Sequence, residues 1–145
     1  MIADTGGLYA LYDGDDRWHR KVVDFIESVD EPVIVPVVIL AELSYMLNRK
    51  LGIDAELELL RSVAAGEMIV EPLTPADISG CARLIEQYRG LNLGLADASV
   101  FIVADRLRTN RILTVDERHF RAVTSTRGQA FTLLPADSDS KSMPR

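Results

Sequence analysis

The chain has 145 residues, which is the size of a single domain. Hydrophobic residues make up 48% of it and charged residues 26%, a balance typical of globular proteins that argues against wholesale disorder. The formal net charge of −6 argues at first against a nucleic-acid partner, but residues 101–145 hold 8 Lys/Arg against 5 Asp/Glu. Charge alone therefore does not decide the class of partner.

The N-terminal sequence Met-Ile-Ala-Asp lacks a basic start followed by an apolar run, so no secretory signal is expected. The longest apolar run, residues 33–41, is divided by Pro36 and is too short to cross a bilayer. The single cysteine, Cys81, lies in an apolar helical pattern and is expected to be a packed core thiol. These features predict a cytoplasmic protein without membrane contact.

Short apolar segments alternate with longer helical ones along the chain. Strand length and β-branched content predict strands at residues 1–3, 33–35, 68–70, 111–115 and 130–133. Helical periodicity predicts helices at about residues 16–29, 37–50, 54–65, 75–89 and 96–109. This alternation predicts an α/β fold, a three-layer sandwich with a mostly parallel sheet of about five strands flanked by helices. The domain is expected to span residues 1–134, followed by a flexible C-terminal tail at residues 135–145.

Several helix boundaries have identifiable causes. Pro36 suits the first turn of the second helix, and Gly52 and Gly66 are suited to ending the second and third helices. Thr74-Pro75 is expected to start the fourth helix. The second helix is apolar almost all round, so it is predicted to be substantially buried.

Four acidic residues stand at positions where a parallel sheet gathers ligands. Asp4 ends the first predicted strand, Asp116 ends the fourth, and Asp97 opens the fifth helix. Each aspartate taken singly is more often a helix N-cap than a ligand. Glu42 interrupts the apolar run of the second helix, so its side chain either escapes to solvent or is compensated inside the fold.

Convergence of these carboxylates would have a large electrostatic cost. At about 5 Å, each pair repels by roughly 3 kcal/mol at an effective dielectric of 20, so protons or a cation must offset the repulsion. An all-oxygen cluster suits a hard ion such as Mg²⁺ or Mn²⁺ rather than zinc. Such ions activate water and stabilise an in-line phosphoryl displacement, which favours phosphodiester hydrolysis.

The arrangement resembles a PIN domain of the VapC toxin type over residues 1 to about 134. The resemblance is carried by Asp4-Thr5, by Ala41-Glu42-Leu43 after Pro36, by Asp97-Ala98, and by Leu113-Thr114-Val115-Asp116 followed by Phe120. It implies a Mg²⁺- or Mn²⁺-dependent endoribonuclease that cleaves structured RNA, such as tRNA or rRNA, and leaves 5′-phosphate and 3′-hydroxyl ends. It also implies a homodimer silenced by a VapB-type antitoxin whose tail enters the acidic groove.

The resemblance also implies a role for individual residues. Asp4, Glu42, Asp97 and Asp116 become the acidic quartet, with Asp4 and Asp97 contacting the metal directly. Glu42 and Asp116 would contact it directly or through water, and one of them would orient the attacking water. The hydroxyl side chains expected to support the carboxylates are those of Thr5, Thr114 and Ser99.

The only sizeable basic cluster lies near the C-terminus. Its possible RNA phosphate contacts are Arg106, Arg108, Arg118 and Arg121, although a solvated helix face explains such a cluster equally well. Trp18 could stack on a base, but anchoring a helix to the core is the more common use of such a residue.

Two other functions compete with the ribonuclease interpretation. A Mg²⁺-dependent phosphohydrolase that forms an aspartyl-phosphate usually has a second aspartate two residues after the nucleophile, where this chain has Gly6, and a lysine nearby, whereas residues 51–140 contain none. A non-catalytic scaffold that binds a protein or RNA would have no reason to retain four mutually repelling acids.

Overall fold

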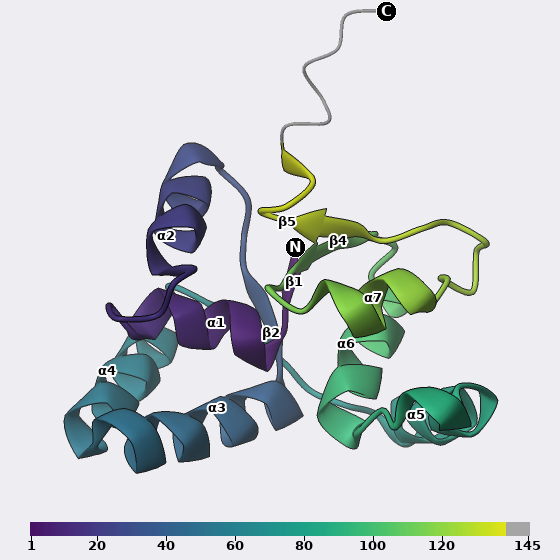
Figure 1. Cartoon of the computed structure of the whole chain (residues 1–145). Coiled ribbons are helices and arrows are strands. Elements are labelled where there is room, and N and C mark those ends of the chain that lie inside the picture. Colours follow the sequence, from purple (N-terminus) through teal and green to yellow (C-terminus); the bar gives the residue numbers. More distant parts are fainter. Residues whose placement is uncertain (139–145) are drawn as a thin grey trace, which may run out of the picture.

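The computed structural model describes residues 1–138, so residues 139–145 of the predicted tail lie outside the described part of the chain. The elements alternate along the chain as shown in Figure 1. In order they are β1 (Ile2–Ala3), α1 (Thr5–Tyr12), α2 (His19–Ser28), β2 (Ile34–Pro36), α3 (Val37–Leu51), α4 (Ile53–Ala64), β3 (Ile69–Glu71), α5 (Pro75–Gln87), the 3₁₀ helix η1 (Arg89–Leu91), α6 (Leu95–Arg106), β4 (Arg111–Leu113), α7 (Glu117–Ala122) and β5 (Thr132–Leu134).

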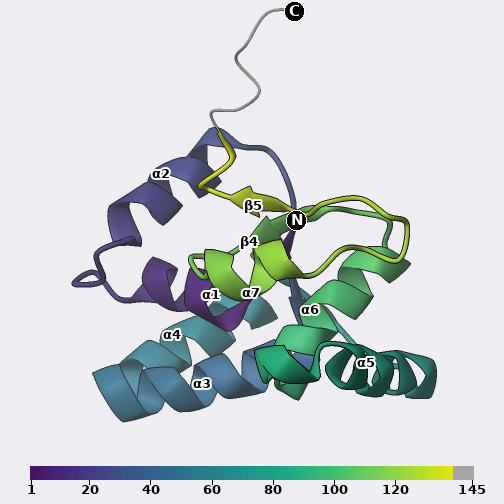
Figure 2. The same ribbon diagram turned by 45° about the vertical axis from the view of Figure 1, so that its right-hand side comes forward.

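The five strands form one parallel sheet in the order β3-β2-β1-β4-β5. Ile2 of β1 is in register with Ile34 of β2 on one side and with Ile112 of β4 on the other. Figures 1 and 2 show α1–α4 gathered on one side of the sheet and α5–α7 on the other. The predicted three-layer α/β fold is therefore confirmed.

The strand order has a direct consequence for where a ligand can bind. The chain builds the sheet outward from β1 through β2 to β3, and then returns to add β4 and β5 on the opposite side of β1. The direction of winding therefore reverses between β1 and β4, and sheets of this kind hold their ligands beyond the carboxyl ends of the strands at such a reversal. Asp4 follows β1 directly, and Thr114 follows β4.

Several predicted boundaries are confirmed, and each has the expected cause. The α3 helix begins after Pro36 and ends at Gly52, whose φ of 100° favours glycine. Thr74 and Asp77 form a reciprocal capping box at the start of α5. The predicted burial of α3 is wrong on its outer side, where the Tyr45 side chain is 64% exposed while its inner positions are buried.

Two helices, α1 and α7, were not predicted. In α1 the adjacent Gly6 and Gly7 weaken the helical signal, since glycine is a poor helix former. A Cβ atom at Gly7 would lie 2.7 Å from the carbonyl oxygen of Leu113, so this glycine lets α1 approach β4. The short α7 begins after Asp116, and β4 ends at Leu113, two residues earlier than predicted.

The first residues of the predicted tail contact the domain. The Leu133 backbone N–H donates to Oδ2 of Asp137 at 2.8 Å, and the Asp137 N–H donates to the Leu133 carbonyl at 2.7 Å. Arg121 of α7 forms an ion pair with Asp137 at 2.8 Å. Residues 135–138 are therefore tied to β5 and α7, and the domain boundary at residue 134 stays a prediction.

Among residues 1–138, no helix combines the length and the apolar character that crossing a membrane requires.

Candidate active site

The four acidic residues are positioned by four different elements. Asp4 follows β1 and caps α1, and Glu42 lies in the second turn of α3. Asp97 lies in the first turn of α6, and Asp116 caps α7. Asp4 is repelled by Asp97 and Asp116, while Asp97 is repelled by Glu42 and Asp116. Each of the four carboxylates is therefore repelled by at least one other, and Asp97 by all three.

Asp4 is the buried member of this group, with 4% of its surface exposed. Its Oδ1 accepts the Gly7 backbone N–H at 2.7 Å, and its Oδ2 accepts the Thr114 hydroxyl at 2.6 Å. Burial raises the pKa of Asp4 to about 7; these two hydrogen bonds oppose the rise, and the charges of Asp97 and Asp116 add to it. Asp4 is therefore a fixed, buried acid that binds its proton more tightly than an ordinary aspartate does.

Asp97 is partly exposed and faces both charged neighbours and solvent. Burial is the largest cause of its raised pKa, and repulsion by Glu42 and Asp116 adds to the rise. A backbone hydrogen bond with Gly94 and the attraction of His119 act in the opposite direction. A divalent cation at this position would favour the ionised form of Asp97.

The sequence left two alternatives for the Glu42 side chain, exposure to solvent or compensation inside the fold, and the structure decides between them. The Glu42 side chain is exposed on α3, and the hydroxyl of Thr5 donates to its Oε2 at 2.8 Å. The acid thus escapes the apolar interior, while Thr5, next to Asp4 in the chain, restrains its direction. The hydrogen bond links the start of α1 to α3.

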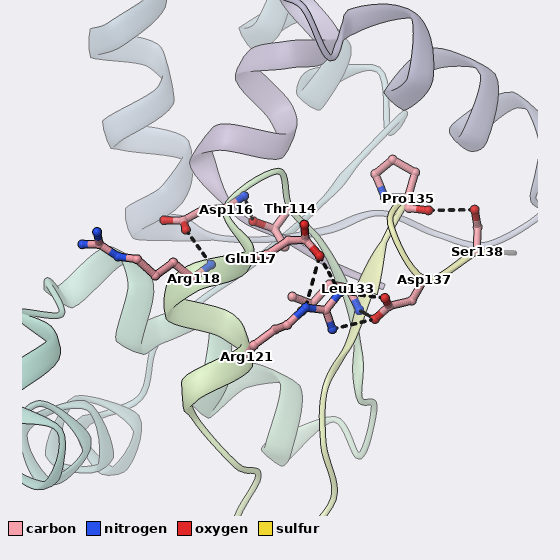
Figure 3. A network of polar contacts seen from close by, with 9 residues as sticks. All are labelled: Thr114, Asp116, Glu117, Arg118, Arg121, Leu133, Pro135, Asp137 and Ser138. Carbon is pink, nitrogen blue, oxygen red and sulfur yellow. Dashed lines mark hydrogen bonds and ion pairs between the residues drawn. The ribbon is translucent and has the colours of Figure 1, made fainter. Parts of the chain in front are cut away.

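Thr114 connects two acids with one hydroxyl group. It donates to Asp4 and accepts the backbone N–H of Asp116 at 3.0 Å. Asp116 in turn accepts the Arg118 N–H at 3.1 Å through Oδ1, as Figure 3 shows. Thr114 and Thr5 therefore each donate a hydrogen bond to a carboxylate of the acidic group.

Ser99 does not join these hydroxyls. It is fully buried, and its hydroxyl donates to the Ala96 carbonyl at 2.6 Å. Two positions beyond Asp97, it lies about 200° around the helix, which turns it into the core. The expectation that Ser99 supports a carboxylate is therefore not met by the geometry.

Arg106 is occupied by a structural role. It contacts Glu71 at 2.7 Å, Asp77 at 3.2 Å and the Pro72 carbonyl at 3.1 Å. These contacts tie α6 to α5 and to the end of β3. Arg108 lies just beyond the C-terminal end of α6, whereas Asp97 lies in the first turn of that helix.

Arg121 is likewise engaged, through ion pairs with Glu117 and Asp137 that raise its pKa. Arg118 is exposed, and its side chain extends away from α7 on the side of Asp116 (Figure 3). Of the four arginines proposed for phosphate contacts, Arg118 is the one that combines proximity to an acid with a free guanidinium among residues 1–138.

His119 belongs to the surroundings of the acids, although no motif of the sequence singles it out. Its Nδ1 is buried, lies 3.3 Å from Oδ2 of Asp116 and makes no hydrogen bond within residues 1–138. The charge of His119 also acts on Asp97. Its position three residues after Asp116 on a helix was the available signal, since residues at that spacing share a face.

The donor chemistry suits a hard divalent cation, because the group consists of carboxylates supported by hydroxyls. In residues 1–138, however, no three His, Cys, Asp or Glu side chains lie close enough together to hold an ion as they stand. Repulsion between carboxylates falls when a cation neutralises them, so a bound ion would let these side chains draw closer together.

Comparisons with known proteins place this sequence among related ones. The model of the PIN domain family matches residues 1–125. Ribonuclease VapC26 from Mycobacterium tuberculosis is 38% identical over 135 residues, which cover 93% of this chain and all of the relative.

Solved structures share the fold at lower sequence identity. The VapC20 toxin from Mycobacterium tuberculosis, described as cleaving the sarcin-ricin loop, superposes with a TM-score of 0.76 at 20% identity, covering 81% of this chain and 90% of that one. The VapBC2 complex from Rickettsia felis, bound to a promoter DNA fragment, gives a TM-score of 0.65 at 12% identity, covering 91% and 96% of the two chains.

Proposed function

This chain belongs to the PIN domain family, and on that premise we propose that it is a divalent-metal-dependent endoribonuclease, the toxin of a VapBC-type toxin–antitoxin pair. The relative that covers nearly the whole chain is named a ribonuclease. The single observation that carries the proposal is the group of four mutually repelling carboxylates around buried Asp4. A bound cation would offset this repulsion, so the group of carboxylates favours the binding of an ion.

We assign Asp4 and Asp97 to direct contact with Mg²⁺ or Mn²⁺, and Glu42 and Asp116 to contact directly or through water. The bound ion supplies a water of lowered pKa and stabilises charge that develops on the phosphate. Thr114 holds Asp4 and the Asp116 backbone, and Thr5 holds Glu42, so the acids are oriented before the ion arrives. Glu42 or Asp116, which are both exposed, orients the attacking water.

We further propose that the chain acts in the cytoplasm on structured RNA, tRNA or rRNA, as a homodimer. A VapB-type antitoxin would silence it. Support for the antitoxin comes from the fold, which is shared with the Rickettsia felis toxin–antitoxin complex and with a toxin–antitoxin complex from Klebsiella pneumoniae.

Cleavage of tRNA and rRNA by the purified chain tests the proposal. With Mn²⁺ or Mg²⁺ present, we expect internal cleavage that stops on chelation. Asp4→Asn and Asp97→Asn should each abolish cleavage, because each removes a negative charge from the ion's contacts. Sequencing the ends of the products identifies the bond that is cut.

Asp54→Asn is the matched control, because Asp54 is exposed in the first turn of α4 and belongs to a different surface. It should cleave RNA at the parental rate. Parental activity in either site variant would contradict the assignment of the site, and wild-type inactivity toward all RNA with both metals would contradict the function.

A further inference from the structure

Two adjoining cavities lie between α2 and the β4–β5 side of the sheet. The larger, about 720 Å³, is lined by α2, by β5 and by residues 135–138, and it has the size of a typical ligand site. The smaller, about 60 Å³, is lined by Trp18 and by residues of the segment from Thr114 to Glu117. Lys21 and Pro135 line both cavities, which together form what we call the α2–β5 groove.

The inner end of this groove lies beside the acidic group. Thr114 lines the smaller cavity, and its hydroxyl donates to Asp4 at 2.6 Å and accepts the Asp116 N–H. A ligand that fills the groove would therefore be separated from Asp4 by the Thr114 side chain. The groove is an approach to the candidate active site from the side of α2.

The charges that border the groove select for an anion. Arg17 and Lys21 make no ion pair or hydrogen bond within residues 1–138, and instead lie over the Trp18 ring at 5.0 and 5.8 Å from its centroid. Such cation–π contacts are weak at an exposed site, so a phosphate can take over both cations at little cost. The other charged side chains that line the groove already have ion-pair partners: Asp24 with Arg20, Arg111 with Glu31, and Glu117 and Asp137 with Arg121 (Figure 3).

We propose that the α2–β5 groove binds a single-stranded RNA segment next to the bond that is cut, with a base stacked on Trp18 and phosphates on Arg17 and Lys21. An aromatic ring flanked by cations is the arrangement that binds single strands, since every base can stack and every phosphate carries a charge. The inference rests on the proposed ribonuclease function, and it assigns the substrate contacts to residues at the start of α2 rather than to the arginines near the C-terminus.

Trp18 is the only tryptophan of the chain, so its fluorescence reports on this groove alone. An unlabelled single-stranded oligoribonucleotide, titrated into the wild-type chain with a chelator present to prevent cleavage, should quench the fluorescence as the base stacks. Arg17→Gln and Lys21→Gln should each weaken binding and lower the slope of log affinity against log salt by about 0.7, the contribution of one phosphate contact with a single strand.

Trp18→Leu should weaken binding by about 5- to 150-fold, measured by anisotropy of a labelled oligonucleotide. Because Trp18 also packs against the core, Trp18→Phe provides the folding control: it keeps a ring for stacking and should retain most of the affinity. Arg61→Gln removes the same charge from an exposed position of α4 and should leave affinity and salt dependence unchanged.

Cleavage kinetics with Mn²⁺ separate this inference from the proposed function. If the wild type cuts RNA, the Arg17 and Lys21 variants should raise KM with little change in kcat. Three results would each contradict RNA binding in the groove. They are cleavage by the Arg17 and Lys21 variants with the same KM as the wild type, no quenching by RNA, and quenching only by an acidic peptide. Quenching and salt dependence as expected, without cleavage by the wild type, would support the groove and contradict the nuclease.

Discussion

At the scale of single residues, the Asp4 carboxylate both caps α1 and belongs to the candidate active site. One of its oxygens caps α1 through the Gly7 N–H, and the other accepts the Thr114 hydroxyl. These contacts hold the side chain in a buried position where ionisation is unfavourable, as its pKa of about 7 indicates. The protein thus retains an acid that weakens its own fold, which is characteristic of a functional position rather than a structural one.

This cost predicts how stability depends on pH in the absence of metal. Because the pKa of Asp4 is about 7 in the folded state and 3.8 in the reference state, the folded chain binds the proton more tightly. The contribution of Asp4 therefore lowers the free energy of unfolding as pH rises from about 4 to about 7. Asp4→Asn removes this contribution. The free energy of unfolding of the variant should therefore exceed that of the wild type by up to about 4 kcal/mol at pH 8 and by little at pH 4.

Urea unfolding with a chelator present, at a series of pH values, measures this difference. The comparison uses the difference between the two proteins, because the contributions of carboxylates that do not interact with Asp4 cancel in it. A constant difference between Asp4→Asn and wild type across pH 4 to 8 would mean that Asp4 is not the buried acid described here.

At the scale of elements, the contact between α1 and β4 brings Asp4 next to Thr114. A Cβ atom at Gly7 would lie 2.7 Å from the Leu113 carbonyl oxygen, whereas one at Gly6 would lie 3.4 Å from the nearest atom, a Val115 methyl group. Two adjacent glycines of the same helix thus differ in whether the fold has room for a side chain. This difference provides a matched pair of substitutions.

Gly7→Ala should destabilise the protein by about 1–3 kcal/mol, because α1 must move away from β4. Gly6→Ala should instead leave stability unchanged or raise it by up to about 1 kcal/mol through better helix propensity. Thermal unfolding of both variants tests this. We also expect Gly7→Ala to lose RNA cleavage at temperatures where it remains folded, and equal effects of the two substitutions would argue against the close approach of α1 to β4.

The ion pairs of Arg106 join α6 to α5 and to the end of β3. Arg106→Gln leaves the buried Asp77 without its cation and should cost about 1–3 kcal/mol of stability. Arg108→Gln, a change of the same kind on an exposed residue just beyond α6, should stay within about 0.5 kcal/mol of wild type. Because neither arginine is assigned to RNA, both variants should cleave it at the parental rate when folded, and a selective loss in Arg106→Gln would contradict its structural role.

The elements also show where sequence reasoning succeeds and where it fails. The alternation of strands and helices predicts the sheet, because parallel strands need crossovers. The helices α1 and α7 are missed since one contains adjacent glycines and the other is only one and a half turns long. The structural role of Arg106 could not be predicted because its partners lie 29 and 35 residues away, and no local pattern reveals such a pairing.

At the scale of the whole molecule, the candidate site is assembled from distant parts of the chain. The positions of Asp4, Glu42, Asp97 and Asp116 could be identified from the sequence because each stands beside a recognisable strand end or helix start. Their individual environments could not, since burial of Asp4 and exposure of Glu42 depend on how α1, α3 and α6 pack. The α2–β5 groove could not be predicted for the same reason, because it lies between α2 and residues more than 100 positions later in the chain.

Binding of Mn²⁺ should therefore stabilise the entire fold. An ion at 100 times its dissociation constant adds about 2.7 kcal/mol to the free energy of unfolding, which raises Tm by several degrees in a domain of this size. The increase should grow with Mn²⁺ concentration and should be largely lost in Asp97→Asn but kept in Asp54→Asn. Equal shifts in all three proteins would place the ion elsewhere.

The strand order also sets a sequence of events during synthesis. Strand β1 leaves the ribosome first and becomes the centre of the sheet, yet its neighbour β4 is made only after α6. Until translation reaches Asp116, a nascent chain lacks both the Thr114 hydroxyl that holds Asp4 and the last of the four carboxylates. A polypeptide released before Thr114 would carry Asp4, Glu42 and Asp97 without the hydroxyl that holds Asp4, so truncation ahead of β4 should leave the group of acids incomplete.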